Sequence, residues 1–165
     1  MCTYSVRAAT QNDIEEITKI YNQGIEDGLA TLETRLRTVE EMDNWFIQRN
    51  DRYRVLVIVK NDRVEGWASL NIFSSRSAYD GVADISIYID REMRGKGLGK
   101  ELLKHLCIAA TTNDFHKLVL STFNNNEAGK NLYKAMGFRE VGTYQRQGKI
   151  NGAWVNVTIM EKLLI

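Results

Sequence analysis

Three glycines, one arginine and two lysines fall within seven consecutive residues near the middle of the chain. The segment follows an alternating stretch that is typical of a strand, and it precedes leucines that recur at helical spacing. The first turn of a helix leaves about four backbone N–H groups unpaired and carries about half a positive charge. Because glycines do not cover these N–H groups, an anion can approach them, and the cationic side chains add to the attraction. We therefore predict a site for phosphate, most simply a pyrophosphate, formed by Arg94, Gly95, Lys96, Gly97, Leu98, Gly99 and Lys100.

Other interpretations of this glycine-rich segment must be weighed. The glycines could form only a tight turn, with solvated cations beside it. A Rossmann fingerprint would need different glycine spacing and an acidic residue about twenty positions later in a βαβ unit. A Walker-type loop would need a hydroxyl residue after Lys100, where this chain has Glu101. An arginine before alternating glycines, between a strand and a helix, favours the phosphate site.

The elements that would position this turn extend along the whole chain. Strictly alternating apolar residues predict strands, and apolar residues at every third or fourth position predict helices. We predict strands over residues 4–10, 53–60, 65–74, 82–89, 116–123, 138–148 and 152–164, and helices over 11–28, 38–50, from the glycine-rich turn to about 112, and within 124–137. The order is β-α-α-β-β-β-α-β-α-β-β, which predicts an α/β fold with a mixed, mostly antiparallel central sheet and helices on both faces.

Length and composition favour a single domain spanning residues 1–165. Hydrophobic residues make up 44% of the 165 residues, which is enough to form a core. The formal net charge of +1 argues against a nucleic-acid surface, and no apolar stretch is long enough to span a membrane. With only Cys2 and Cys107, we expect no disulfide framework and a reducing, cytoplasmic location. No metal is expected, because His105 and His116 lack metal-ligand spacing with another histidine or cysteine.

Two segments resemble the signature of the GCN5-related N-acetyltransferases, abbreviated GNAT. The residues from Arg94 to Gly99 resemble this family's acyl-CoA-binding motif, Arg/Gln-x-x-Gly-x-Gly/Ala. The later stretch NNNEAGKNLYKAMGF resembles a second family pattern, except that Gly129 replaces its small polar residue. The matching residues there are Asn126, Leu132, Tyr133, Gly137 and Phe138. The order of elements fits the same superfamily over nearly the whole chain, so the resemblance implies a GNAT fold and acetyl-CoA as the acetyl donor.

The N-terminal half resembles one branch of this family. The segments VRAATQNDIEEITKIYNQGI, ATLETRLRTVEEMDNWF and FSSRSAYDGVADISIYI look like the phosphinothricin and methionine sulfoximine N-acetyltransferases. The chain departs from the phosphinothricin enzymes at two places, with Asp84 where they have a glutamate and Asn151 where they have a histidine. The resemblance therefore implies acetylation of the primary amine of a small molecule, an amino acid or a toxic analogue, and leaves the particular amine open.

The resemblance also assigns roles near the reacting groups. Asp84 is the expected general base, acting directly or through a water, because a protonated amine has no lone pair for attack. Its alternative is a solvated or ion-paired strand residue. Tyr133 is the expected general acid for the leaving thiolate and a contact of the cofactor, and its alternative is an aromatic residue at the pocket rim. The backbone of Ile87, Tyr88 and Ile89 is expected to hold the acetyl carbonyl and the pantetheine arm.

The remaining expected contacts lie on loops. Arg76 is expected to bind a carboxylate of the substrate, because a guanidinium does so with two hydrogen bonds, although a solvated loop arginine fits the sequence equally well. Thr31 and Glu33 are expected to line the acceptor pocket on the resemblance alone. Asn126 is expected to hydrogen-bond the pantetheine arm, with an N-cap or turn role as the alternative.

Two other functions stay open on the sequence. The first is acetylation of a protein or peptide amine, or of a polyamine, which would need an open or an acidic groove, and Arg76 argues against the polyamine. The second is a catalytically idle acyl-CoA-binding or regulatory domain, against which the presence of Asp84 counts. A homodimer is expected by analogy with this branch, with the C-terminal strands as its interface.

Overall fold

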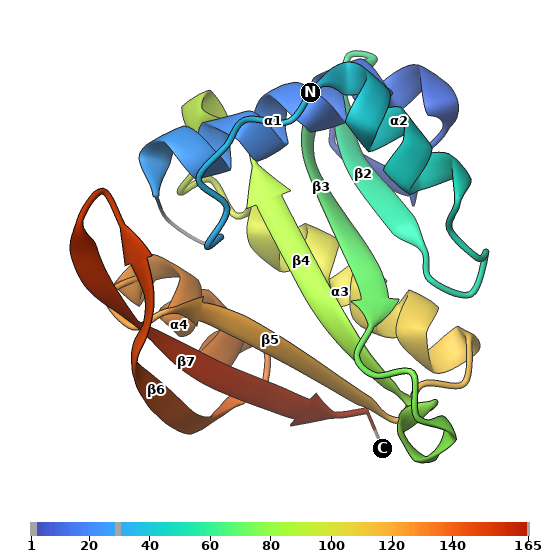
Figure 1. Cartoon of the computed structure of the whole chain (residues 1–165). Helices are drawn as coiled ribbons and strands as arrows, with labels where there is room; N and C mark the ends of the chain where they lie inside the picture. The colour runs from blue at the N-terminus through green and yellow to red at the C-terminus, as the bar shows by residue number, and fades with distance from the viewer. Residues whose placement is uncertain (1–2, 29–30, 165) are drawn as a thin grey trace.

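The computed structural model describes residues 3–28 and 31–164, and Figure 1 shows their arrangement. The strands are β1 (Ser5–Ala8), β2 (Val55–Lys60), β3 (Arg63–Ile72), β4 (Val82–Ile89), β5 (Lys117–Phe123), β6 (Arg139–Ile150) and β7 (Ala153–Leu163). The helices are α1 (Ile14–Asp27), α2 (Val39–Ile47), α3 (Leu98–Thr112) and α4 (Glu127–Ala135), with short 3-10 turns at Gln11–Asp13, Ser77–Tyr79 and Arg91–Met93. The predicted fold class and order of elements are confirmed.

All seven strands join one sheet in the order β1-β2-β3-β4-β5-β7-β6. Neighbouring strands are antiparallel except β4 and β5, which are parallel and pair only over Val82–Asp84 and Lys117–Val119. Beyond these residues the two strands diverge and form a V in Figure 1. The sheet is therefore split at its centre, where β4 continues without a partner on its β5 side.

The register shows which backbone groups of β4 face this split. The N–H of Asp90 donates to the carbonyl of Glu65 on the β3 side at 2.8 Å, and in an antiparallel pair the bonding direction alternates from residue to residue. The N–H and C=O groups of Ile87 and Ile89 therefore point toward β5. Because β5 pairs with β4 only as far as Asp84, these groups have no partner within the described sheet.

Helices cover both faces of the sheet. In Figure 1, α3 lies behind the sheet and α1 and α2 lie in front of it. The apolar stripe of α3 packs on inward side chains of β2 to β5, and α1 and α2 pack on the opposite face around Val57 and Trp67. The buried leucines of α3 are Leu98, Leu102, Leu103 and Leu106, as predicted. Each contributes about 1.5–3 kcal/mol when fully buried, so the core fixes the helix that begins at the glycine-rich turn.

Local contacts shift some boundaries from their predicted positions. The α1 helix begins at Ile14 rather than at residue 11, because the carboxylate of Asp13 accepts hydrogen bonds from the N–H of Thr10 and from the Arg7 guanidinium, each at 2.7 Å. These bonds hold the preceding residues in a 3-10 turn. Cys107 packs half-buried against the core, where burial raises the pKa of its thiol, whereas Cys2 lies outside the described residues. None of the described helices has the length and apolarity that a membrane span needs.

Candidate active site

The glycine-rich turn adopts backbone conformations that favour glycine. Gly95 and Gly97 have φ angles of +77° and +84°, and a Cβ built on either glycine would meet no heavy atom within 4 Å. The backbone is therefore open on its outer side, which is what an approaching anionic group requires. Gly99 serves packing as well, because a Cβ at this position of α3 would lie 3.0 Å from Cδ2 of Leu132 on α4.

The cations around the turn differ in their surroundings. Arg94 contacts the carboxylate of Asp27, at the end of α1, at 2.7 Å, and Arg91 contacts the same carboxylate at 2.9 Å. The hydrogen bond from Arg91, supported by that from Arg94, lowers the pKa of Asp27. This carboxylate therefore stays ionised and fixes Arg94 beside the turn. Lys100 lines the adjoining cavity, whereas Lys96 is exposed and lies outside the lining.

A cavity of about 300 Å³, here called the turn cavity, lies against this segment. It is bounded by α1, the end of β4, the glycine-rich turn and α4. Its lining includes Ile87, Tyr88, Ile89, Arg94, Gly95, Gly97, Leu98, Gly99, Lys100, Asn126 and Tyr133. The structure thus brings together every residue expected to bind the donor except Lys96, although these residues come from two separate segments of the sequence.

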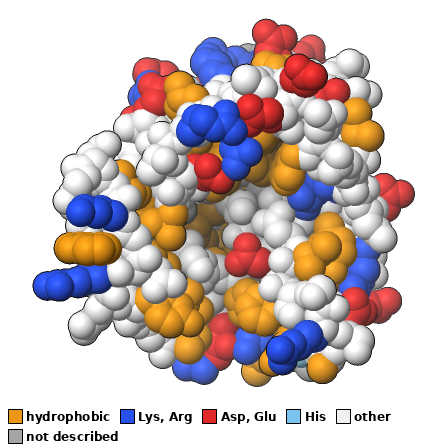
Figure 2. All heavy atoms as spheres, in the orientation of Figure 1, with side chains coloured by type: hydrophobic (Ala, Val, Ile, Leu, Met, Phe, Trp, Pro, Cys, Tyr) orange, Lys and Arg blue, Asp and Glu red, His pale blue; other side chains and the backbone are white. Residues whose placement is uncertain are grey.

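A second cavity of about 190 Å³, here called the central cavity, lies where β4 and β5 separate. Its lining includes Thr31, Asp84, Ser86, Ser121, Thr122 and Tyr133. Ile87, Tyr88 and Tyr133 line both cavities, so the two meet at the split in the sheet. Figure 2 shows that this face of the molecule is hollowed at its centre, with an acidic side chain inside the hollow.

Asp84 has the environment that a general base requires. It lines the central cavity and lies directly opposite Asn71 of β3 in the sheet register. Burial raises the pKa of the Asp84 carboxyl to about 6, and a hydrogen bond with Asn71 opposes part of this shift. A carboxyl with this pKa is ionised at neutral pH and is a better proton acceptor than an ordinary aspartate.

Tyr133 lies on α4 at the boundary between the two cavities. It is only 8% exposed, and its ring packs against Phe138 with centroids 5.8 Å apart. Burial and the charge of Asp84 raise the pKa of Tyr133, so its hydroxyl stays protonated at neutral pH. The hydroxyl can therefore serve as a proton donor, and the residue is more deeply buried than a rim aromatic.

Asn126 caps α4 as well as lining the turn cavity. Its Oδ1 accepts from the N–H of Gly129 at 3.0 Å, and its Nδ2 donates to Oγ1 of Thr122 at 3.1 Å. A Cβ at Gly129 would lie 2.5 Å from this Nδ2, which accounts for glycine at the position where the family pattern has a small polar residue. The structure shows the capping role, and the contact with a pantetheine arm stays a prediction.

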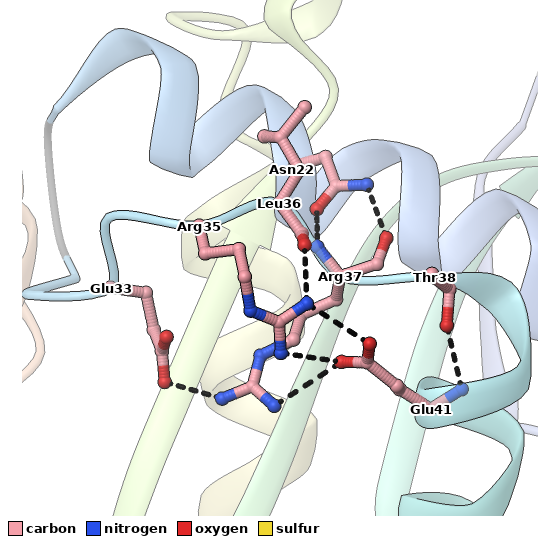
Figure 3. A network of polar contacts seen from close by, with 7 residues as sticks. All are labelled: Asn22, Glu33, Arg35, Leu36, Arg37, Thr38 and Glu41. Atoms are coloured by element: carbon pink, nitrogen blue, oxygen red, sulfur yellow. Dashed lines mark hydrogen bonds and ion pairs between the residues drawn. The ribbon is translucent and has the colours of Figure 1, made fainter.

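The connection between α1 and α2 borders the cavities and is held by the network in Figure 3. Asn22 binds both backbone groups of Arg37: its amide donates to the C=O and accepts from the N–H, each at 2.9 Å. The Arg37 guanidinium binds Glu33 at 2.6 Å and Glu41 at 3.5 Å. Arg35 adds two hydrogen bonds of 3.0 Å to Glu41. The segment is therefore pinned to α1 and α2.

The three loop residues expected to bind the acceptor lie in different surroundings. Thr31 lines the central cavity, and Glu33 is engaged with Arg37 outside the lining. Arg76 is exposed between β3 and β4, where its N–H donates to Oγ of Ser74 at 3.2 Å. It lines neither the turn cavity nor the central cavity. Its role as a carboxylate-binding residue therefore stays a prediction from the sequence and the resemblance.

A third cavity of about 570 Å³, here called the aromatic cavity, lies over β3 and shares Ser86 and Tyr88 with the central cavity. Its lining includes the rings of Tyr21, Trp45, Trp67 and Tyr88 and the polar side chains of Arg37, Glu41, Arg49 and Asn71. The sequence does not reveal this cavity, because tryptophans such as Trp45 and Trp67 are most simply interpreted as core or interface residues. The available signal was the alternation in β3, which places Asn71 on the same face as Trp67.

Comparisons with known proteins agree with this geometry. The family profile described as acetyltransferase (GNAT) domain matches residues 6–159. A Bacillus subtilis protein, provisionally named phosphinothricin acetyltransferase YwnH, is 30% identical over 161 residues, which are 97% of this chain and 99% of that protein. The L-methionine sulfoximine/L-methionine sulfone acetyltransferase of Pseudomonas aeruginosa is 28% identical over 160 residues, which are 95% of this chain and 92% of the relative. A GNAT phosphinothricin acetyltransferase from Sinorhizobium meliloti, solved in complex with acetyl-CoA, superposes with a TM-score of 0.92 and 29% identity, over 98% of this chain and 88% of that one.

The chain belongs to the GNAT family of acetyltransferases, and its resemblance to the phosphinothricin and methionine sulfoximine branch is confirmed. It is an acetyl-CoA-dependent N-acetyltransferase. The expectation that the reaction needs no metal stays a prediction; among the described residues no three His, Cys, Asp or Glu side chains are grouped as metal ligands.

Proposed function

We propose that this enzyme acetylates the primary amine of a small molecule, an amino acid or a toxic analogue of one. The observation that carries the proposal is the position of Asp84, a carboxylate of raised pKa in the cavity that meets the turn cavity at Tyr133. Similarity to proteins named for phosphinothricin and methionine sulfoximine supports an amino-acid-like acceptor. We also propose that residues 1–165 form one catalytic domain, that it acts in the cytoplasm, and that two chains form a homodimer.

The donor would be held by the turn cavity. The open amides of Gly95 and Gly97, at the N-terminus of α3, suit the pyrophosphate of acetyl-CoA, and Arg94 and Lys100 add positive charge. The unpaired backbone groups of β4 can hydrogen-bond the amides of the pantetheine arm, which would then take the place of a neighbouring strand. Lys96 is proposed to contact the phosphates from its exposed position.

The acetyl transfer would proceed between the two cavities. Asp84 takes the proton that the acceptor nitrogen must lose, directly or through a water, and that nitrogen forms the new bond to the acetyl carbon. The bond from this carbon to the thioester sulfur breaks, and Tyr133 gives its proton to the departing thiolate. The second proton that the nitrogen loses passes to solvent, from which Tyr133 regains a proton. The N–H groups of Ile87 and Ile89 face the split in the sheet and can stabilise negative charge on the carbonyl oxygen.

The acceptor would enter from the central cavity beside Thr31. Glu33 would act there through Arg37, which it holds in place. Arg76 is retained as a proposed carboxylate-binding residue on the resemblance. The competing functions are acetylation of peptide amines or polyamines and an idle acyl-CoA-binding domain. The carboxylate of Asp84, with its raised pKa in the central cavity, counts against the idle domain.

An acetyl-CoA turnover assay tests this proposal. The acceptors are L-amino acids, phosphinothricin and L-methionine sulfoximine, with a polyamine and a short peptide for comparison. We expect turnover with at least one amino-acid-type acceptor and a loss of about 100-fold or more in kcat for Asp84→Asn. Asp80→Asn is the matched control, because the Asp80 side chain is 73% exposed and lies outside the central cavity, which Asp84 lines. Turnover of only the peptide or the polyamine, or donor binding without any turnover, would contradict the proposal.

A further inference from the structure

Arg49 lies just beyond the end of α2, on the wall of the aromatic cavity, and is held in one orientation. Its Nη2 donates to the carbonyl oxygens of Tyr53 (3.3 Å) and Leu70 and to Oδ1 of Asn71 (3.2 Å). Its guanidinium stacks on Trp45, with Cζ 4.5 Å from the ring centroid. All the oxygens that Arg49 contacts belong to neutral groups, so these contacts orient the guanidinium without neutralising it.

No carboxylate pairs with Arg49 within residues 3–28 and 31–164. Its Nη1 also has no hydrogen-bond partner among those residues. Burial lowers the pKa of Arg49 to about 10, which still leaves it charged at neutral pH. A half-buried charge without a counter-ion is costly, and an anionic ligand in the cavity would offset that cost.

The other two arginines that could bind an anionic acceptor are less suitable. Arg37 also lines the aromatic cavity, but Glu33 and Glu41 both bind its guanidinium. Arg76 is exposed and lies outside the lining. Arg49 is thus the cation of this cavity whose charge the described residues leave uncompensated.

Asn71 connects this cation to the candidate base. Its Oδ1 accepts from Arg49, its Nδ2 donates to Oγ of Ser86 at 3.1 Å, and it lies opposite Asp84 in the register. The amine and the carboxylate of an α-amino acid are separated by a single carbon. With hydrogen bonds of about 3 Å at each end, one such molecule can bridge a base and a cation on opposite sides of Asn71.

We infer that Arg49 binds the carboxylate of an amino-acid acceptor in the aromatic cavity, while Asp84 receives the proton of its amine. The inference rests on the proposed function and adds the residue that selects acceptors bearing a carboxylate. The rings of Tyr21, Trp45 and Trp67 then surround the acceptor's side chain, which favours bulky apolar amino acids.

The test compares each amino acid with the amine that lacks its carboxyl group, for example L-phenylalanine with phenethylamine and L-methionine with its decarboxylated amine. The measured quantity is the ratio of kcat/KM for the amino acid to kcat/KM for the amine. We expect Arg49→Gln to lower this ratio about tenfold or more, mainly through the KM of the amino acid, with the KM for acetyl-CoA unchanged. Arg49→Lys, which keeps the charge, should lower the ratio less.

Matched variants distinguish a loss of carboxylate binding from a loss of structure. Arg54→Gln removes an exposed arginine nearby and should leave the ratio unchanged. The inference would be overturned if Arg49→Gln lowered kcat/KM equally for the amino acid and the amine. It would also be overturned if Arg76→Ala lowered the ratio and Arg49→Gln did not. Either result would leave the proposed function standing. If Arg49→Gln does not fold, a ratio in Arg49→Lys equal to that of the wild type, with only a lower Tm, would also overturn it. Failure of the wild type to acetylate any amino acid would overturn the proposed function itself, and the inference with it.

Discussion

Burial of Asp84 is unfavourable for stability at neutral pH and would be favourable for the proposed role as a general base. Burial raises its pKa to about 6, so the folded protein binds this proton more tightly than the unfolded chain does. The stability that the protonated carboxyl contributes is therefore present below the unfolded pKa of 3.8 and is lost as the pH rises through about 6. At neutral pH the enzyme carries a half-buried negative charge, which is the form that accepts a proton.

The pH dependence of activity follows from this pKa. Asp84 must be ionised to accept a proton, so kcat/KM for the acceptor should rise with pH through a midpoint near 6. The increase is measured as initial rates between about pH 5 and 8, corrected for the ionisation of the acceptor amine. Asp84→Asn should abolish this rising limb along with most of the rate. If kcat/KM of Asp84→Asn still rose with pH through a midpoint near 6, the titrating group would be another residue.

The same substitution should affect stability in the opposite direction. Asparagine fills the space of Asp84 without its charge, so we expect the Tm of Asp84→Asn to equal or exceed that of the wild type at pH 7. The difference between the two proteins should vanish only as the pH falls well below the unfolded pKa of 3.8, where the aspartate is protonated in both states. Thermal scans across this pH range provide the measurement. A lower Tm at pH 7 would show that Asp84 is structural, for example through its bond with Asn71.

At the scale of elements, the site exists because β4 and β5 pair over only a few residues and then separate. The parallel pairing of Val82–Asp84 with Lys117–Val119 places the proposed base, Asp84, next to the point of separation. Beyond this point the backbone of β4 and the side chain of Tyr133 border both the turn cavity and the central cavity. In the proposed mechanism, the same split would provide both the donor contacts and the passage between donor and acceptor.

The glycine-rich turn permits a matched pair of substitutions. Gly97→Val places a branched side chain in the open space outside the turn and should raise the KM for acetyl-CoA about tenfold or more. The φ angle of +84° also makes valine strained there, at a cost of about 1–2 kcal/mol in the free energy of unfolding. Gly152→Val has nearly the same strain, at a φ of +81° in the β6–β7 turn, and should leave the KM unchanged. An equal increase in the KM for acetyl-CoA in both variants would contradict binding of the donor at the turn.

The pinned connection between α1 and α2 gives a prediction for the acceptor side. Asn22→Ala removes both hydrogen bonds to the backbone of Arg37, so the segment that carries Thr31 should loosen. We expect the acceptor KM to rise about three- to tenfold and the donor KM to stay the same, with a loss of about 1–3 kcal/mol in stability. Asn44→Ala, at an exposed position of α2, is the control. A change confined to the donor KM would contradict this assignment.

The glycine-rich turn and the aromatic cavity show which features the sequence could predict and which it could not. The turn, the stripe of α3 and the order of elements depend on residues close together in the chain, and these were predicted correctly. The aromatic cavity depends on Arg49 and Asn71, which are 22 positions apart and meet only through the β2–β3 register and the docking of α2. The sequence shows that both residues are polar, but its periodicity does not show that they face each other.

At the scale of the whole molecule, the C-terminal hairpin exposes several large apolar side chains. β6 is an edge strand of the sheet, and the β6–β7 hairpin extends at the left of Figure 1, away from α2. Its large exposed apolar side chains include Val141, Tyr144 and Trp154, with exposures of 50%, 55% and 58%. Exposed apolar side chains on an edge strand are typical of a surface that pairs with another chain.

The proposed homodimer therefore makes a prediction at this surface. Light scattering after size exclusion should give about twice the chain mass of 18.9 kDa. Tyr144→Asp puts a charge at the centre of the exposed hairpin and should shift the protein toward the single-chain mass, because an interface of about 1,200 Å² or more does not tolerate an unpaired buried charge at its core. Ile108→Asp, which alters an equally exposed apolar residue on α3, should leave the mass unchanged. A single-chain mass for the wild type at all concentrations, or the same shift in both variants, would contradict a dimer formed through these strands.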